Sequence, residues 1–72
     1  MDFSDTLVAL RKARGLTQKQ VATEIGLSEI AIQNYESGRR KPAYDALLAL
    51  GNYFDVSVDY LMGRTGNSAI NR

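Results

Sequence analysis

Two short stretches with helical spacing lie close together in the middle of the chain, and only about three residues separate them. The first is expected from Thr17 to about Ile25 and the second from Ser28 to Ser37. Gly26, between them, allows the chain to turn through a positive φ angle with little strain. Two helices joined in this way cross at roughly 90 to 120° and form a helix-turn-helix. This pair of helices restricts the fold more than any other feature of the sequence.

The apolar residues of this segment have the sizes that such a crossing requires. Ala22 is expected where the two helices come closest, because a larger side chain would push them apart. Ile32 and Tyr35, three positions apart on one face, fix the second helix to the core. The outer face of that helix is then free, and a helix of this diameter fits the major groove of B-form DNA. The other inward positions of the segment are Val21, Ile25 and Leu27.

The rest of the chain has helical spacing as well, and no stretch alternates apolar and polar residues with a period of two. The sequence therefore predicts an all-α fold. Ser4 is expected as the N-cap of the first helix and Gly15 as its stop, while Pro42 keeps residues 39–42 in a loop. The expected ranges are Ser4–Arg14, Thr17–Ile25, Ser28–Ser37, Ala43–Phe54 and Ser57–Met62. Outside the central pair, the expected inward residues are Leu7, Leu10, Leu47, Leu50 and Phe54.

A chain of 72 residues is long enough for one small domain and excludes two. We expect a helical domain over residues 1–63 and a polar, flexible tail over residues 64–72. Apolar residues make up 44% and charged residues 24%, which fits a folded globular chain and excludes a disordered one. No apolar run approaches the roughly 18 residues that a membrane span needs, and residues 1–4 lack the basic start of a secretion signal. A soluble, cytoplasmic protein is expected.

The sequence contains neither cysteine nor histidine. Disulfides and thiolate zinc sites are therefore excluded, so stability must come from packing or from association with another subunit. The commonest general base and most ligands for transition metals are missing as well. The eight acidic residues are scattered, with no pair around an evident cleft. We expect no enzyme activity, no cofactor and no metal site.

The net charge of +1 conceals an uneven distribution along the chain. Between Arg11 and Lys41, seven basic residues stand against three acidic ones, which gives this segment a charge of +4, while the rest of the chain carries −3. Such a segment suits contact with a polyanion, although a solvated surface with salt bridges explains it equally well from composition alone.

A set of residues spread along the chain matches one known pattern in register: Gly15-Leu16-Thr17-Gln18, Val21-Ala22, Gly26-Leu27-Ser28, Ile32, Tyr35-Glu36, Gly38-Arg39-Arg40, Pro42 and Val56-Ser57-Val58-Asp59-Tyr60-Leu61. Over roughly residues 7–63, the chain resembles the Cro/C1-type (XRE) helix-turn-helix domains of phage repressors and bacterial transcription regulators. The resemblance implies a compact five-helix, lambda-repressor-like DNA-binding domain in which the second and third helices form the helix-turn-helix.

Two positions depart from the pattern of this family. Gly51 stands inside the fourth helix where the family prefers Ala, and it costs about 1 kcal/mol by helix propensity. Asp55 replaces the Gly or Asn that is usual in the following turn.

The resemblance also implies that outward residues near the start of the third helix reach base edges in DNA. Asn and Gln can bond adenine through two hydrogen bonds, Glu can accept from cytosine N4, and Ile can contact the methyl group of thymine. Taken singly, these would be ordinary solvated side chains, and the helix-turn-helix context is what favours DNA readout. The carboxylate of Glu29 is repelled by phosphates unless it gains a specific base contact. The alternative roles for Glu29 are therefore an interaction with the helix N-terminus or the exclusion of wrong sequences. In this chain the base-reading candidates are Glu29, Ile30, Gln33 and Asn34.

Candidates for phosphate contacts lie around the same helix. Gln18 resembles the family residue that binds a phosphate through its amide, and a mere polar residue of the first turn is an equal alternative from the sequence alone. Three adjacent basic residues often mean only a solvated turn, but their position directly after the third helix favours phosphate binding. The full set of phosphate candidates is Gln18, Lys19, Ser28, Arg39, Arg40 and Lys41.

Arg11 and Glu36 are interpreted as structural residues. Arg11 follows Leu10 on the inner side of the first helix, and Glu36 follows Tyr35 on the inner side of the third. The family commonly pairs its residues at these positions as a semi-buried ion pair, so the resemblance implies that this pair ties the two helices together. Loss of either partner would leave a partly buried charge without a counterion.

A palindromic operator is read by a dimer whose reading helices lie roughly 34 Å apart. Small members of the family often dimerise around the fourth and fifth helices, which implies a homodimer surface there. The candidates are apolar or aromatic residues beyond the expected core, with Tyr60 slightly favoured as a core residue: Tyr53, Val58, Tyr60 and Met62.

The sequence thus predicts a regulator of transcription that binds double-stranded DNA sequence-specifically, as a homodimeric repressor on a palindromic operator. The alternative is an antitoxin-like or adaptor module that binds a protein and in which DNA binding is secondary or lost. No site for a small-molecule effector is expected in a chain of this length.

Overall fold

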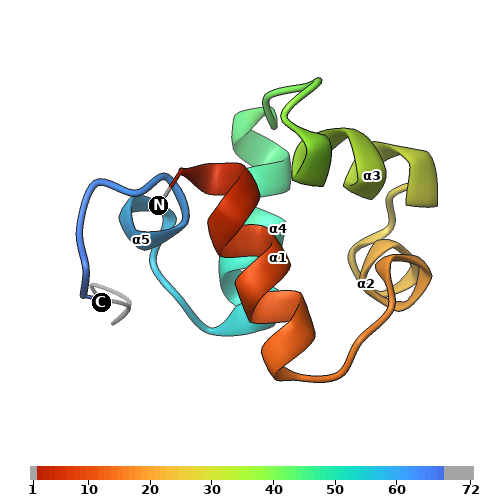
Figure 1. Ribbon diagram of the computed structural model, residues 1–72, viewed down its shortest axis with the longest axis horizontal. Coiled ribbons are helices and arrows are strands. Elements are labelled where there is room, and N and C mark those ends of the chain that lie inside the picture. Colours follow the sequence, from red (N-terminus) through yellow and green to blue (C-terminus); the bar gives the residue numbers. More distant parts are fainter. Residues whose placement is uncertain (1, 68–72) are drawn as a thin grey trace.

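The computed structural model describes residues 2–67, and these form five helices around one core (Figure 1). α2 and α3 lie on one side of α1, α5 lies on the other side, and α4 lies behind α1 (Figure 1). No strand occurs among residues 2–67, so the predicted all-α fold is confirmed. Of the predicted tail, residues 64–67 are exposed and residues 68–72 lie outside the described residues. The helices are α1 (Phe3–Ala13), α2 (Gln18–Ile25), α3 (Glu29–Ser37), α4 (Tyr44–Phe54) and α5 (Val58–Leu61).

Side-chain caps determine where most of these helices begin. Thr17 Oγ1 accepts a hydrogen bond from the Gln20 amide at 3.0 Å, and Gln20 Oε1 accepts one from the Thr17 amide at 2.7 Å. This reciprocal pair is a capping box, which satisfies two amides at the start of α2. Ser28 and Ser57 accept bonds from amides three residues further along, at 3.1 and 3.0 Å. Thr17, Ser28 and Ser57 are therefore the N-caps of α2, α3 and α5, and each is the first residue of an expected range.

The start of α1 differs from the prediction. Asp2 is the N-cap, since its Oδ1 accepts a hydrogen bond from the Asp5 amide at 2.9 Å. Ser4 lies inside the helix, and its Oγ donates to the carbonyl oxygen of Tyr35 in α3 at 2.6 Å. Asp and Ser are equally good N-caps, so local spacing could not distinguish them. The contact that engages Ser4 joins residues far apart in the sequence.

One apolar core joins all the helices. Each contributes one of the largest fully buried side chains: Leu7, Val21, Ile32, Leu50 and Leu61. The predicted core residues Ala22, Tyr35, Leu47 and Phe54 are also buried, while Leu10, Ile25 and Leu27 are half-buried and pack against the core. Burial of five further residues was not predicted from the sequence: Thr6, Ala46, Gly51, Val56 and Leu61.

Gly51 allows α4 to lie directly against the chain that leads into α5. A Cβ atom at this position would lie 2.9 Å from the carbonyl oxygen of Val56 and 3.7 Å from Leu61 Cδ1. The Val56 amide also donates to the Gly51 carbonyl oxygen at 2.9 Å, which holds the two backbones together. Between them Asp55 adopts a left-handed conformation with φ 55°. Helix propensity alone therefore misjudges Gly51, because the side chain of an Ala would clash here.

Candidate nucleic-acid interface

α3 buries one face in the core and presents the other to solvent. Ile32 and Tyr35 are buried, whereas Glu29, Gln33 and Ser37 are exposed, as the helical period predicts. Ile30 has 67% of its surface exposed. The fourth base-reading candidate differs, since Asn34 is only half-exposed. The four base-reading candidates thus all lie on α3, and Asn34 is the least exposed of them.

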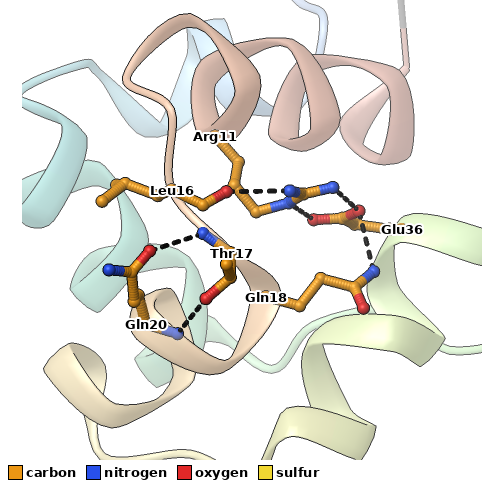
Figure 2. A network of polar contacts seen from close by, with 6 residues as sticks. All are labelled: Arg11, Leu16, Thr17, Gln18, Gln20 and Glu36. Atoms are coloured by element: carbon orange, nitrogen blue, oxygen red, sulfur yellow. Dashed lines mark hydrogen bonds and ion pairs between the residues drawn. The ribbon is translucent and has the colours of Figure 1, made fainter.

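A polar network fixes the inner side of α3 to α1 and to the start of α2 (Figure 2). Arg11 Nε and Nη2 donate to the two carboxylate oxygens of Glu36 at 2.6 and 2.9 Å. The two side chains are only 14% and 7% exposed. Arg11 Nη1 donates to the Leu16 carbonyl oxygen at 2.9 Å, and Gln18 Nε2 donates to Glu36 Oε1 at 3.1 Å. The ion pair expected between the first and third helices is present, and the participation of Gln18 in it was not predicted.

Hydrogen bonding within this network favours the charged forms of both partners. The pKa of Arg11 is raised above its ordinary value, because the hydrogen bond to Glu36 outweighs the effect of burial. For Glu36, burial acts to raise the pKa, but hydrogen bonds from Arg11 and Gln18 and the positive charges of Arg11 and Lys12 outweigh it. The pKa of Glu36 is therefore lowered, and its carboxylate stays ionised at neutral pH.

A second attachment holds the C-terminal part of α3. Besides the hydrogen bond from Ser4 to the Tyr35 carbonyl oxygen, the Phe3 and Tyr35 rings meet edge to face with centroids 5.9 Å apart. The start of α1 thus contacts α3 near its end, and the Arg11–Glu36 pair contacts it one residue further on. Contacts of this kind hold the outer face of α3 in one orientation.

The phosphate candidates surround α3, and most of them are free to bind an anion. Within residues 2–67 the ion pairs are Arg11–Glu36 and the exposed Arg64–Asp59 pair. The four basic side chains among the phosphate candidates therefore have no ion-pair partner there. The Arg40 amide donates to the Asn34 carbonyl oxygen at 3.3 Å, which folds the basic loop back against α3. Gln18 keeps one amide hydrogen after its bond to Glu36, and the Ser28 hydroxyl keeps its proton. The four cations are Lys19, Arg39, Arg40 and Lys41.

Arg14 has a structural role that the charge count did not reveal. Its guanidinium donates to the carbonyl oxygens of Tyr53 and Phe54 at 3.1 and 2.9 Å and lies over both rings. It therefore supports the C-terminal end of α4. Because Arg11 and Arg14 both bind groups of the protein itself, less of the +4 segment is available for a polyanion than its sum suggests.

Exposed apolar side chains gather on α4 and just after α5. Tyr44 is 66% exposed, Leu48 39% and Met62 41%, and all three line a hollow of about 590 Å³. Of the other residues considered for a dimer surface, Tyr53 and Tyr60 are half-buried and pack against the core, and Val58 is half-buried in the wall of the same hollow. Tyr44 and Leu48 were missed, although the apolar residues at positions 44, 46, 47, 48 and 50 together spread over more of the helix surface than one core-facing stripe needs.

The described part of the chain has no helix long and apolar enough to cross a membrane. Nor do residues 2–67 contain a group of three His, Cys, Asp or Glu residues placed to hold a metal ion.

The chain is similar to known proteins both in sequence and in structure. The model of the helix-turn-helix family matches residues 7–61. A helix-turn-helix-type transcriptional regulator of Bacillus subtilis, YqaE, is 38% identical over 68 residues, which are 94% of this chain and 59% of YqaE. The cryptic phage CTXphi transcriptional repressor RstR of Vibrio cholerae is 38% identical over 64 residues, which are 89% of this chain and 57% of RstR. The chain thus spans little more than half the length of these relatives.

Among solved structures, that of the P22 c2 repressor in complex with a synthetic operator is similar with a TM-score of 0.85. The match has 28% sequence identity and covers 90% of this chain and 98% of the repressor chain. A five-helix, lambda-repressor-like fold is thereby confirmed.

Proposed function

Because this chain belongs to the Cro/C1-type helix-turn-helix family, we propose that it regulates transcription by binding double-stranded DNA sequence-specifically, as a repressor. The observation that carries the proposal is the outer face of α3, which is exposed while side chains of α1 and α2 hold its inner face. A helix held in this way can enter the major groove without losing much conformational freedom. Relatives named as repressors, such as RstR and the P22 c2 repressor, support the same function.

Four residues of α3 are proposed to read bases. Gln33 and Asn34 carry amides that suit adenine, Glu29 carries an acceptor for an amino group, and Ile30 carries an apolar surface for a methyl group. Asn34 is half-buried and its side chain has one rotatable bond fewer than that of Gln33, so it has fewer conformations to lose. We therefore expect Asn34 to be the more selective of the two amides.

Phosphate contacts are proposed on both sides of these residues. Gln18 would donate its remaining amide hydrogen from a position that Glu36 fixes, and Ser28 would donate its hydroxyl beside the free amides that begin α3. Lys19 and the loop of Arg39, Arg40 and Lys41 add positive charges without partners among residues 2–67. These contacts would supply affinity and salt dependence but no direct base recognition.

A homodimer is proposed to form through the α4 and α5 surface. Tyr44, Leu48 and Met62 expose apolar area around one hollow, and a second copy would cover the same patch about a twofold axis. The variant Leu48→Glu should remain folded, because the side chain is 39% exposed, but should sediment as a monomer in analytical ultracentrifugation. If wild-type protein sediments as a monomer both alone and on its operator, this part of the proposal is wrong.

Selection of DNA from a random pool, followed by gel shifts at several salt concentrations, tests the function. We expect a palindromic motif with half-sites about 34 Å apart and an affinity that falls steeply with salt. Selection of no motif, with only weak binding to all sequences, would instead favour a protein-binding module of the antitoxin or adaptor kind.

A further inference from the structure

Resting on the proposed DNA-reading function, we infer that the first turn of α3 reads a 5-methylcytosine, so that operator binding depends on methylation of the DNA. Two adjacent side chains of that turn, Glu29 and Ile30, carry the inference. Each is unusual on a surface that faces phosphates, and one base in DNA accounts for both.

Ile30 is unusual because it is an apolar side chain that is largely exposed. At 67% exposure it is the most exposed large apolar side chain of the described residues, and its outward neighbours Glu29 and Gln33 are polar. An aliphatic side chain at this place gains binding energy only from an apolar partner. In the major groove the apolar group on a base edge is a methyl group on carbon 5 of a pyrimidine, as thymine carries it. A cytosine methylated on carbon 5 presents the same group at the same place.

Glu29 restricts the choice between these two pyrimidines. Its carboxylate is exposed and has no ion-pair partner within residues 2–67. An ionised carboxylate only accepts hydrogen bonds, so in the groove it requires an amino group. Cytosine presents the amino group N4 beside carbon 5, whereas thymine presents the acceptor O4 there. Thymine would satisfy Ile30 and repel Glu29, and unmodified cytosine would satisfy Glu29 and leave Ile30 without a partner.

Only 5-methylcytosine offers the methyl and the amino group on one base. Neighbouring helical residues point in different directions, but the glutamate side chain is long enough to turn its carboxylate toward the base that Ile30 covers. The inference therefore predicts that both groups are read at the same pyrimidine.

The test uses the selected operator and four bases at each pyrimidine of one half-site in turn: cytosine, 5-methylcytosine, thymine and uracil. Comparing 5-methylcytosine with cytosine, and thymine with uracil, isolates the methyl group. Comparing 5-methylcytosine with thymine, each paired with its complementary purine, exchanges the amino group for a carbonyl oxygen and changes the purine as well. The amino effect is therefore the part of this preference that Glu29→Gln removes. For wild-type protein we expect one position where the methyl group raises affinity about fourfold, the value for burial of one such group. At that position 5-methylcytosine should bind most tightly of the four.

Three variants assign the two effects to side chains. Ile30→Ala should abolish the methyl effect and keep the amino effect, and Glu29→Gln should reduce the amino effect and keep the methyl effect. Ile30→Val, the matched control, should retain most of the methyl effect, because it keeps a branched apolar surface. Circular dichroism should show all three variants folded, since both side chains are exposed.

The inference is overturned if the methyl and amino effects fall at different positions, if no position responds to methylation, or if Ile30→Ala responds like the wild type. Each of these results still requires specific operator binding. Failure of the proposed function would appear differently, as the absence of any selected motif.

Discussion

The attachment of α3 to the rest of the molecule and the junction of α4 with α5 depend on different kinds of contact. α3 is attached by long-range side-chain hydrogen bonds, from Ser4 to Tyr35 and from Arg11 and Gln18 to Glu36. α4 and α5 are joined by close approach of the backbone, with Gly51 lying against the carbonyl of Val56. Hydrogen bonds are directional and hold α3 in one orientation, whereas close packing limits the size of the side chain that fits between α4 and α5. The attachment and the junction should therefore respond to different substitutions.

The largest effect is expected from Glu36→Ala at the attachment of α3. It leaves Arg11, whose side chain is 14% exposed, without its counterion, and loss of one partner of such a pair costs about 3 kcal/mol or more. In a small domain whose total stability is roughly 5 to 10 kcal/mol, thermal unfolding should shift to much lower temperature. Arg11→Ala should behave similarly. The control is Arg64→Ala, which breaks an exposed pair at 3.9 Å and should change little; wild-type stability of Glu36→Ala would contradict this prediction.

Acid should weaken the same attachment in the wild-type protein. Because the pKa of Glu36 is lower in the folded than in the unfolded state, its contribution to stability is present above the unfolded pKa, near the ordinary value of 4.5, and is lost as the pH falls through the folded pKa. Urea unfolding followed from pH 6 to pH 2 should show this loss below about pH 4.5. The slope of stability against pH should be shallower in Glu36→Gln. Equal slopes in both proteins would mean that Glu36 is not responsible.

Close packing at the junction of α4 with α5 is tested by Gly51→Ala. Helix propensity alone predicts a gain of about 1 kcal/mol, but the new Cβ would lie 2.9 Å from the Val56 carbonyl oxygen. Overpacking of this kind costs about 1 to 3 kcal/mol, so we expect a net loss in the free energy of unfolding measured with urea. Asn52→Ala, at the exposed next position, is the control and should be neutral or slightly stabilising. A more stable Gly51→Ala protein would show that the two backbones separate easily.

The proposed division between base and phosphate contacts predicts that two substitutions change DNA binding in different ways and leave the stability of the protein nearly unchanged. Asn34→Ala should alter sequence preference, with about a tenfold loss on the preferred base pair and less on others. Arg40→Ala should weaken binding to all sequences alike and reduce the salt dependence by about one counterion. Quantitative gel shifts on matched and mismatched operators measure both. If both variants scale affinity uniformly, Asn34 does not read a base.

Much of the fold could be predicted because local rules govern it. The caps Thr17, Ser28 and Ser57 and the left-handed Gly15 and Gly26 act within a few residues of their own positions. The features that were missed all join distant parts of the chain: Ser4 with Tyr35, Arg14 with Phe54, and Gln18 with Glu36. The candidate site shows the same limit, since the helical period gave the outward face of α3 but not the half-burial of Asn34.

The smallest expected effect concerns the one helix start in this comparison that lacks a side-chain cap. α2 begins with a full capping box at Thr17, whereas α4 begins at Ala43, which makes no such bond although its backbone is extended like that of a cap. Ala43→Ser should therefore stabilise the protein by about 1 kcal/mol, and Thr17→Ala should destabilise it by a similar amount. Differential scanning calorimetry of both variants measures the difference. If Ala43→Ser brings no gain, then packing of Leu47 and Leu50, and not the free amides, determines where α4 begins.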